Sequence, residues 1–189
     1  MLLIPHRATL QSHPLETPRT LLYPLTEGAD ELWAVVDESR EHLAPWLPWV
    51  PFNDGPRSSK RYLDACTADW DTGRAMRFAI RSRSDQSLLG AITLDNCVHM
   101  HRSCDLGYWL KKGATGAGLM TEVGKATVEF AHERANIHRI RCAAAVGNLP
   151  SLRVIQRLGF RFEGVCRQAE YIQSRWVDHA VFAHVQGYD

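Results

Sequence analysis

Hydrophobic and polar residues follow one another in patterns that predict both strands and helices. Arg19–Leu25 is a short strand candidate, and Ala29–Ser39 has the apolar spacing of a helix. Ser58–Asp71 is interpreted as a second helix that begins with a serine cap. Between these two helices, Pro45–Pro51 contains three prolines, which exclude a regular helix or a central strand there.

The middle of the chain has the patterns of β-strands. Met76–Ser82 and Leu88–Val98 flank a polar turn and predict a hairpin, and Asp105–Leu110 predicts a further strand. Residues 113–118 then form a glycine-rich loop. Apolar residues recur at a 4-3-4 spacing from Leu119 to Phe130, which predicts a helix directly after the loop.

The last third alternates between the two kinds of element. Arg139–Val146 predicts a strand. Asn148 predicts the start of the helix that follows, and Gly159 predicts its end. Phe160–Cys166 and Val177–Val185 are the last strand candidates. The order β-α-α-β-β-β-α-β-α-β-β predicts an α+β fold, in which a mixed sheet is flanked by helices.

Composition narrows the class of protein. The 189 residues are 45% apolar and 23% charged with a net charge of +1, which predicts one folded domain over residues 1–189. Near-neutral charge argues against direct nucleic-acid binding, and no apolar run is long enough to span a membrane. Residues 1–16 are expected to be a loose leader without the apolar core of a signal peptide. Five cysteines without a CxxC pair predict reduced thiols, and hence a cytoplasmic protein.

The glycine-rich loop is the strongest local signal for chemistry. A strand, a glycine loop and a helix N-terminus together expose backbone N–H groups to which a phosphate can bind. The loop matches neither common nucleotide motif, because Gly118 is followed by Leu119 and Met120 and because G-x-G-x-x-G counted from Gly116 ends at Thr121. From the residues alone, an anion site and a tight turn are both open.

Several short motifs follow one another along the chain. They are His42–Trp49, Gly107–Leu110, Gly116–Glu122, Asn148–Ser151, Leu158–Phe160 and Glu163–Tyr171, with Asp178 further on. Over roughly residues 15–187 they resemble the GNAT family of acetyl-CoA-dependent N-acetyltransferases, and within it the RimJ/RimL branch, which acetylates protein N-termini. The last motif is most similar to the RimL type. The resemblance implies a twisted, mostly antiparallel sheet of about seven strands.

The resemblance also implies where acetyl-CoA binds. The implied residues are Tyr108, Trp109, Leu110, Thr115, Gly116, Ala117, Gly118, Leu119, Met120, Asn148 and Ser151. Thr115 departs from the family's pattern, which has Gln or Arg there. We expect this departure to matter little, because backbone amides of the loop hold the pyrophosphate.

Catalytic roles are implied by the same resemblance. Glu170 matches the glutamate that acts as the base in RimL-like enzymes, although a surface salt bridge would also explain a glutamate at this position. Ser151 matches the serine near the CoA sulfur, where it acts as hydrogen-bond donor or acid, although serine is also common in the first turn of a helix. Tyr108 and Tyr171 are the reserve candidates for the acid.

Two tryptophans are candidates for the substrate side of the site. Rigid aromatic surfaces such as Trp46 and Trp49 bind extended peptides at low entropic cost. The alternative is that both fill the core under an irregular loop.

A metal site is not expected. Cys97, His99, His101 and Cys104 are the kinds of ligand that zinc takes. In an extended strand, however, residues four apart are separated by about 13 Å, so this segment is interpreted as a connection between strands.

The function implied is acetyl transfer from acetyl-CoA to the α-amine of a protein N-terminus, with a ribosomal stalk protein as the partner suggested by the RimL type. An α-amine suits a weak base, because its ordinary pKa lies far below that of lysine. The alternatives are an acetyltransferase for a small amine, such as a polyamine or an aminoglycoside, and a non-catalytic acyl-CoA-binding module. The oligomeric state is left open, with a homodimer as one alternative.

Overall fold

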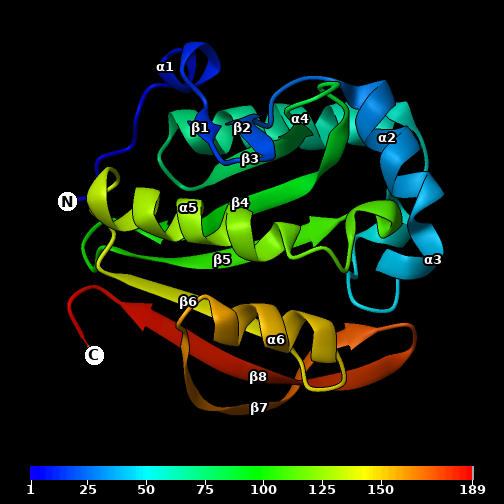
Figure 1. The fold of residues 1–189 in the computed structure, drawn as a ribbon. Coiled ribbons are helices and arrows are strands. Elements are labelled where there is room, and N and C mark those ends of the chain that lie inside the picture. The colour runs from blue at the N-terminus through cyan, green and yellow to red at the C-terminus, as the bar shows by residue number, and fades with distance from the viewer. Residues whose placement is uncertain (189) are drawn as a thin grey trace.

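The computed structural model describes residues 1–188, in which one eight-stranded sheet runs through the molecule (Figure 1). The strands are β1 (Leu15–Glu16), β2 (Thr20–Pro24), β3 (Met76–Ser82), β4 (Leu88–Val98), β5 (Ser103–Leu110), β6 (Arg139–Ala145), β7 (Arg161–Ile172) and β8 (Arg175–Val185). Their order in the sheet is β1-β2-β3-β4-β5-β6-β8-β7, and among these neighbours β5 and β6 alone pair in parallel. The predicted mixed, mostly antiparallel sheet is therefore confirmed.

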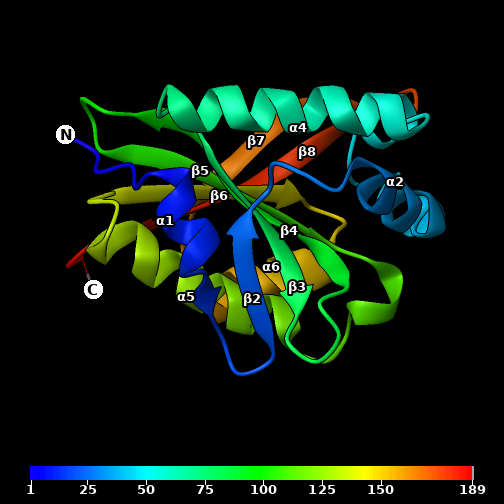
Figure 2. The ribbon, with the colours of Figure 1, turned by 90° about the horizontal axis from the view of Figure 1, so that it is seen from above.

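Helices cover both faces of this sheet (Figure 2). They are α1 (Arg7–Ser12), α2 (Ala29–Glu38), α3 (Arg40–Leu43), α4 (Pro56–Asp71), α5 (Leu119–Glu133) and α6 (Leu149–Arg157), with short 3-10 turns at Val50–Phe52 and Lys112–Ala114. Helices α2 and α4 lie on one face, and α5 and α6 lie on the other. Within residues 1–188, none of the helices has the length and hydropathy that crossing a bilayer requires.

Strand alternation divides the core between the two faces. Successive side chains of a strand point to opposite sides, so Phe78 and Ile92 join the larger core with α5, while Ala79 and Ala91 join the smaller core with α2 and α4. By the same alternation, Tyr108 belongs to the α5 face and Trp109 to the α2 face. Neighbouring residues of β5 thus face different compartments.

The parallel pair in the centre of the sheet is short. Its register runs from Ser103 opposite Arg139 to Leu106 opposite Cys142, although β5 continues to Leu110 and β6 to Ala145. Beyond Leu106 the two strands separate, while β5 stays paired with β4 along its other edge. The sheet therefore has a gap in its middle, with an unpaired edge of β5 along one side.

Two predicted boundaries are corrected. Helix α4 begins at Pro56 instead of at Ser58, because proline suits the first turn of a helix and no side chain caps it. The final hairpin is longer than predicted on both strands, since Gln173 and Ser174 turn the chain with positive φ angles of 49° and 61°. This two-residue turn lacks the Asn-Gly signal that announces most turns of its kind.

The expectation of a loose leader over residues 1–16 is wrong. Leu2 and Leu10 are 4% and 0% exposed, and the segment contributes α1 and β1. Its first residues lie at the C-terminal end of α5, where Asn136 donates to the Met1 carbonyl. After it, Arg19 binds Glu122 in the first turn of α5 (2.7 Å). The leader therefore accompanies α5 from one end to the other.

Removal of the Leu10 side chain tests this correction. We expect Leu10→Ala to lower the free energy of unfolding by about 2–5 kcal/mol, because the change leaves a cavity in the core. Leu3, 61% exposed in the same segment, is the matched control, and Leu3→Ala should change stability by less than about 0.5 kcal/mol. Denaturant unfolding of both variants measures the difference, and equal losses would contradict a packed leader.

Candidate active site

A cavity of about 530 Å³ lies where β5 and β6 separate, on the face covered by α5 and α6. It brings together most residues that sequence analysis assigned to acetyl-CoA: Tyr108, Trp109, Leu110, Thr115, Gly116, Gly118, Leu119, Met120, Asn148 and Ser151. Ala117 does not line it, and its carbonyl instead accepts a hydrogen bond from Arg19 (3.0 Å). We call this space the cofactor cavity.

The N-terminus of α5 opens into the cofactor cavity. Gly116 and Gly118 have φ angles of +84° and +73°, and a Cβ on either would meet no atom within 4 Å. Gly118 is the helix cap and offers no side-chain hydrogen bond, so the N–H groups of the first turn are left for a ligand. The hydroxyl of Thr121, which also lines the cavity, is buried without a partner. These features fit an anionic group such as a diphosphate.

The start of α6 carries a pair of hydroxyl groups. Asn148 caps the helix by accepting a hydrogen bond from the Ser151 backbone N–H (3.3 Å). The hydroxyls of Ser151 and Tyr108 are 2.9 Å apart, so one donates to the other across the gap. Burial raises the pKa of Tyr108 above its ordinary value, which keeps this hydroxyl protonated. The pair is therefore a source of hydrogen-bond donors at the unpaired edge of β5.

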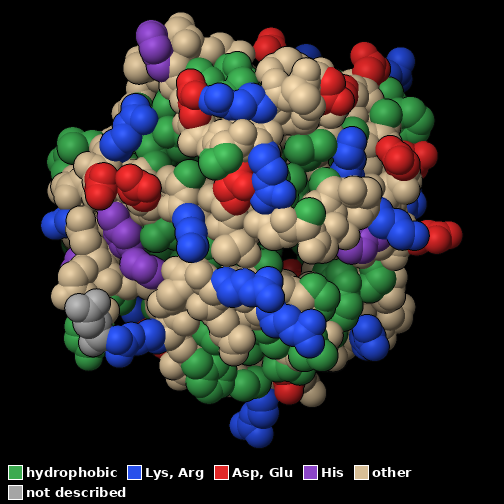
Figure 3. Space-filling model, in the orientation of Figure 1, with side chains coloured by type: hydrophobic (Ala, Val, Ile, Leu, Met, Phe, Trp, Pro, Cys, Tyr) green, Lys and Arg blue, Asp and Glu red, His purple; other side chains and the backbone are tan. Residues whose placement is uncertain are grey.

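Cationic side chains at the cofactor cavity were missed by sequence analysis. Arg153 and Arg157 lie one turn apart on α6, and both line the cavity together with His42. Figure 3, which views the face of α5 and α6, shows a hollow with Lys and Arg side chains beside it. The i, i+4 spacing of the two arginines in the sequence could have predicted that they lie on one face of a helix. Together they add positive charge where an anionic ligand would enter.

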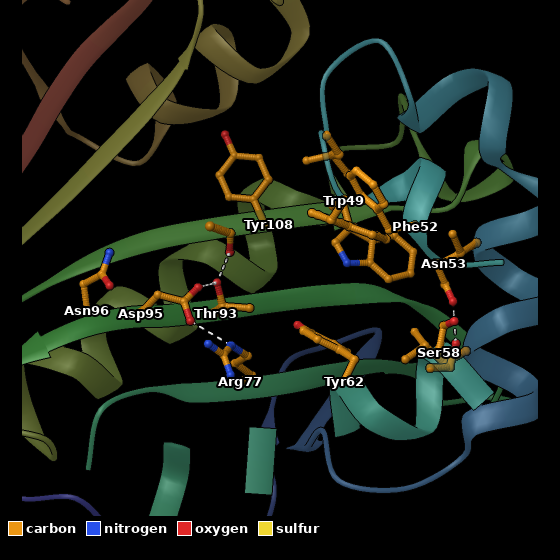
Figure 4. A pocket seen from close by; sticks show the side chains of 16 residues that line it. Trp49, Phe52, Asn53, Ser58, Tyr62, Arg77, Thr93, Asp95, Asn96 and Tyr108 are labelled. Atoms are coloured by element: carbon orange, nitrogen blue, oxygen red, sulfur yellow. Dashed lines mark hydrogen bonds and ion pairs between the residues drawn. The ribbon is translucent and has the colours of Figure 1, made fainter. Parts of the chain in front are cut away.

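A second cavity of about 610 Å³ opens on the opposite face, between the sheet and α2 and α4 (Figure 4). Its walls include the aromatic side chains of Trp49, Phe52 and Tyr62. Leu47, Tyr108 and Trp109 line both cavities, so the two spaces adjoin at the gap between β5 and β6. We call this space the acceptor cavity.

The structure separates the two tryptophans. Trp49 lines the acceptor cavity, where its ring centre lies 6.0 Å from that of Trp109. Trp46 lines the cofactor cavity, with its ring 3.9 Å from the Cβ position of Gly147. The structure therefore brings Trp49 to the acceptor cavity and Trp46 to the cofactor cavity, and the two tryptophans do not share one wall.

Glu170 and Tyr171 lie on β7 and line neither cavity. The carboxylate of Glu170 is half-buried and lies 3.3 Å from Nε2 of His179 on β8. His179 in turn pairs with Ala145, the last residue of β6 before the turn to α6. Tyr171 is exposed and packs on Trp176. Glu170 is thus connected to the site through β8, whereas Ser151 and Tyr108 lie in it.

The cysteine and histidine cluster forms the connection between β4 and β5. His99 binds the carbonyl of Gly73 (3.1 Å), and burial raises the pKa of Cys97 to about 12, so its thiol is neutral. Within residues 1–188, no three Cys, His, Asp or Glu side chains converge as a metal site would need.

The arrangement suits group transfer between two ligands. The two cavities lie on opposite faces of the sheet, so ligands bound in them would meet beside backbone N–H groups of β5 and the hydroxyls of Tyr108 and Ser151. Donors fixed at such a place stabilise the negative charge that develops when a nucleophile attacks a carbonyl.

Several known proteins are similar to this chain in sequence. The model of the acetyltransferase (GNAT) domain matches residues 19–161. The putative ribosomal N-acetyltransferase YdaF of Bacillus subtilis is 31% identical over 77% of this chain and 79% of its own. The ribosomal protein uS5-alanine N-acetyltransferase of Escherichia coli is 27% identical over 94% of this chain and 93% of its own.

Solved structures show the same fold. RimJ of Mycobacterium smegmatis, in complex with CoA-disulfide, superposes with a TM-score of 0.84 at 26% identity and covers 92% of this chain and 86% of its own. The chain belongs to the GNAT family and is an acetyl-CoA-dependent N-acetyltransferase.

Proposed function

We propose that this enzyme acetylates the α-amine of a protein N-terminus, and that its substrate is a ribosomal protein. The observation that carries the proposal is the acceptor cavity, which opens to solvent beside the unpaired edge of β5 and is walled by aromatic side chains. A chain end can enter such a space while its following residues lie on the aromatic wall. Relatives named for ribosomal-protein acetylation support this class of substrate.

The charge of the acceptor cavity favours an α-amine over lysine. At pH 7, deprotonation costs about 1 kcal/mol for an α-amine and about 4–5 kcal/mol for lysine. Among the described residues that line the cavity, Asp95 is the one carboxylate, and it already binds Arg77 and Thr93. A cavity lined by a single carboxylate suits the amine that is easier to deprotonate.

The proposed mechanism is direct attack of the amine on the thioester that bound acetyl-CoA supplies. The loop from Gly116 to Met120 holds the pyrophosphate on its backbone amides. Backbone N–H groups of β5 beyond Leu106 donate to the carbonyl oxygen. Ser151 donates to the departing sulfur, while Tyr108 holds the Ser151 side chain in place. Glu170 is assigned as the base, as the matching family residue is; because it lines neither cavity, it acts on the amine through bridging water.

The pyrophosphate site predicts a defect in Gly118→Val. A branched side chain at this position would occupy the space that the phosphate needs, so we expect the Kd for CoA to rise about tenfold or more, which is about 1.4 kcal/mol. Gly187 is the matched control, because its φ of +71° is nearly the same, its surroundings are also open and it lies outside both cavities. Calorimetric titration of CoA into both variants measures the difference. Unchanged affinity in a folded Gly118→Val protein would refute the site.

The role of Glu170 is tested by Glu170→Gln. We expect turnover at pH 7 to fall by about 10²–10⁴-fold, which is typical for loss of a general base, while the Kd for acetyl-CoA is unchanged. The loss should shrink at higher pH, because more of the amine is then neutral without help. If Glu170 only forms its contact with His179, the variant keeps wild-type turnover at pH 7, and Glu170 is removed from the mechanism.

The acceptor is identified by release of free thiol from acetyl-CoA against a panel of amines. We expect activity on peptides that begin with Ser or Ala, including the N-terminus of a ribosomal stalk protein. Blocking the α-amine should abolish it even when the peptide contains lysine. Spermidine and an aminoglycoside complete the panel. Acetylation of these small amines, with none of any peptide, would replace the proposal with the small-molecule alternative, and no acetylation of any amine would favour a binding module.

A further inference from the structure

The floor of the acceptor cavity contains a carboxylate that is fixed from two sides. Asp95 on β4 accepts a hydrogen bond from Nε of Arg77 on one oxygen (2.7 Å) and from the Thr93 hydroxyl on the other (2.5 Å) (Figure 4). The side chain of Asp95 is still 30% exposed, whereas that of Arg77 is 17% exposed. A carboxylate oxygen accepts more than one hydrogen bond, so Asp95 retains acceptor capacity toward the cavity.

Gly107 brings this carboxylate close to the reacting edge. A Cβ on Gly107 would lie 2.8 Å from the Thr93 hydroxyl and 3.9 Å from Oδ2 of Asp95. Gly107 is the first residue of β5 beyond the end of its pairing with β6, and Tyr108 follows it. The absence of a side chain at Gly107 therefore leaves Asp95 beside the gap where the two cavities meet.

The backbone directly after Asp95 is irregular, and this irregularity helps to place Asp95 in the cavity. The register between β4 and β5 shifts after Asp95, and Asn96 has a φ of +51°. Asn96 turns its amide to Asp105, to which it donates a hydrogen bond (2.8 Å), so that this second carboxylate is occupied. Arg141 also lies 3.4 Å from Asp105. Of the two acidic side chains at this end of the strands, only Asp95 lines the cavity.

The charged side chains around Asp95 form ion pairs with one another in the absence of a ligand. Arg77 also binds Asp69 on α4 (2.7 Å), and Arg74 binds the same carboxylate. Other titratable groups around Asp95 are the uncharged side chains of Tyr62, Cys66, Cys97 and Cys104. Asp95 is therefore a formal negative charge that is oriented by its partners and open to a cation on one side.

We propose that Asp95 binds the ammonium form of the acceptor's amine and positions it at the gap, so that the enzyme recognises an acceptor with a cationic terminal nitrogen. The proposal rests on the proposed function for the identity of that acceptor. Asp95 is a positioning residue: it holds the ammonium by a charge-assisted hydrogen bond, and before attack the nitrogen gives up its proton, through water, to the base Glu170. Such bonds are stronger than those between neutral groups, so the contact contributes to substrate affinity.

Asp95→Asn tests the charge with little change in shape. At pH 7 we expect KM for a Ser-initiated peptide to rise about tenfold with kcat changed less, because recognition of the bound ammonium is lost while the reacting groups remain. The effect should diminish at pH 9.5, where the α-amine is mostly neutral and a carboxylate no longer discriminates. Asp95→Glu, which keeps the charge, should recover part of the affinity.

Asp69→Asn is the matched control. Asp69 binds the same guanidinium at the same 2.7 Å distance but does not line the cavity. If the effect of Asp95→Asn arises from a disturbed Arg77, Asp69→Asn raises KM as much as Asp95→Asn does. The ratio of the KM of Asp95→Asn to the KM of the wild type is then also the same at pH 7 and at pH 9.5. Either result overturns the proposal. An unchanged Kd for acetyl-CoA in both variants shows that they fold.

A second measurement uses the wild-type protein alone. A peptide whose terminal amine is replaced by a hydroxyl is neutral, and we expect it to inhibit about tenfold more weakly at pH 7 than a peptide of the same sequence with a terminal methylamine. Equal inhibition would overturn the proposal even if Asp95→Asn does not fold. If the enzyme acetylates only small amines, the proposed function fails, but the same variants still measure recognition of those amines by Asp95.

Discussion

Separation of β5 from β6 after Leu106 is the constraint on which the site depends. A sheet that stayed fully paired would isolate its two faces, and the two cavities would have no common boundary. Because β5 remains hydrogen-bonded to β4, its free edge is held in place where the pairing with β6 ends. Alternation along this strand then assigns Tyr108 to one face and Trp109 to the other, although both reach the gap.

The two sides of the site differ in how well they tolerate amino-acid substitutions. On the cofactor side, the start of α5 leaves backbone N–H groups for an anionic ligand, so we expect that Thr115 can replace a longer polar residue at little cost. On the acceptor side, side chains from β3, β4, α4 and the loop before it make the walls, and each must be placed by tertiary packing. Differences in substrate among related enzymes are therefore expected on the acceptor side.

The same distinction explains what the sequence could predict. Gly118 and Asn148 were identified because a glycine loop and a helix cap are short, contiguous signals, and the structure places both at the cofactor cavity. No such short motif identifies Asp95 in the sequence, because its place in the site depends on Arg77 from a neighbouring strand and on Gly107 from another. Trp46 and Trp49 likewise lie in an irregular loop without periodicity, so the sequence could not predict that they line different cavities.

The N-terminal segment has a consequence for how the protein responds to its ligand. Residues from Met1 to Arg19 are attached to both ends of α5, and the glycine-rich loop of residues 113–118 leads into the N-terminal end of that helix. Folding of the first residues and folding of the loop are therefore coupled. A ligand that binds only the folded loop lowers the population of every opened state in which the helix has lost this support. Acetyl-CoA should in this way protect the chain terminus from proteolysis at a distance, and a tag that displaces the first residues should weaken the loop.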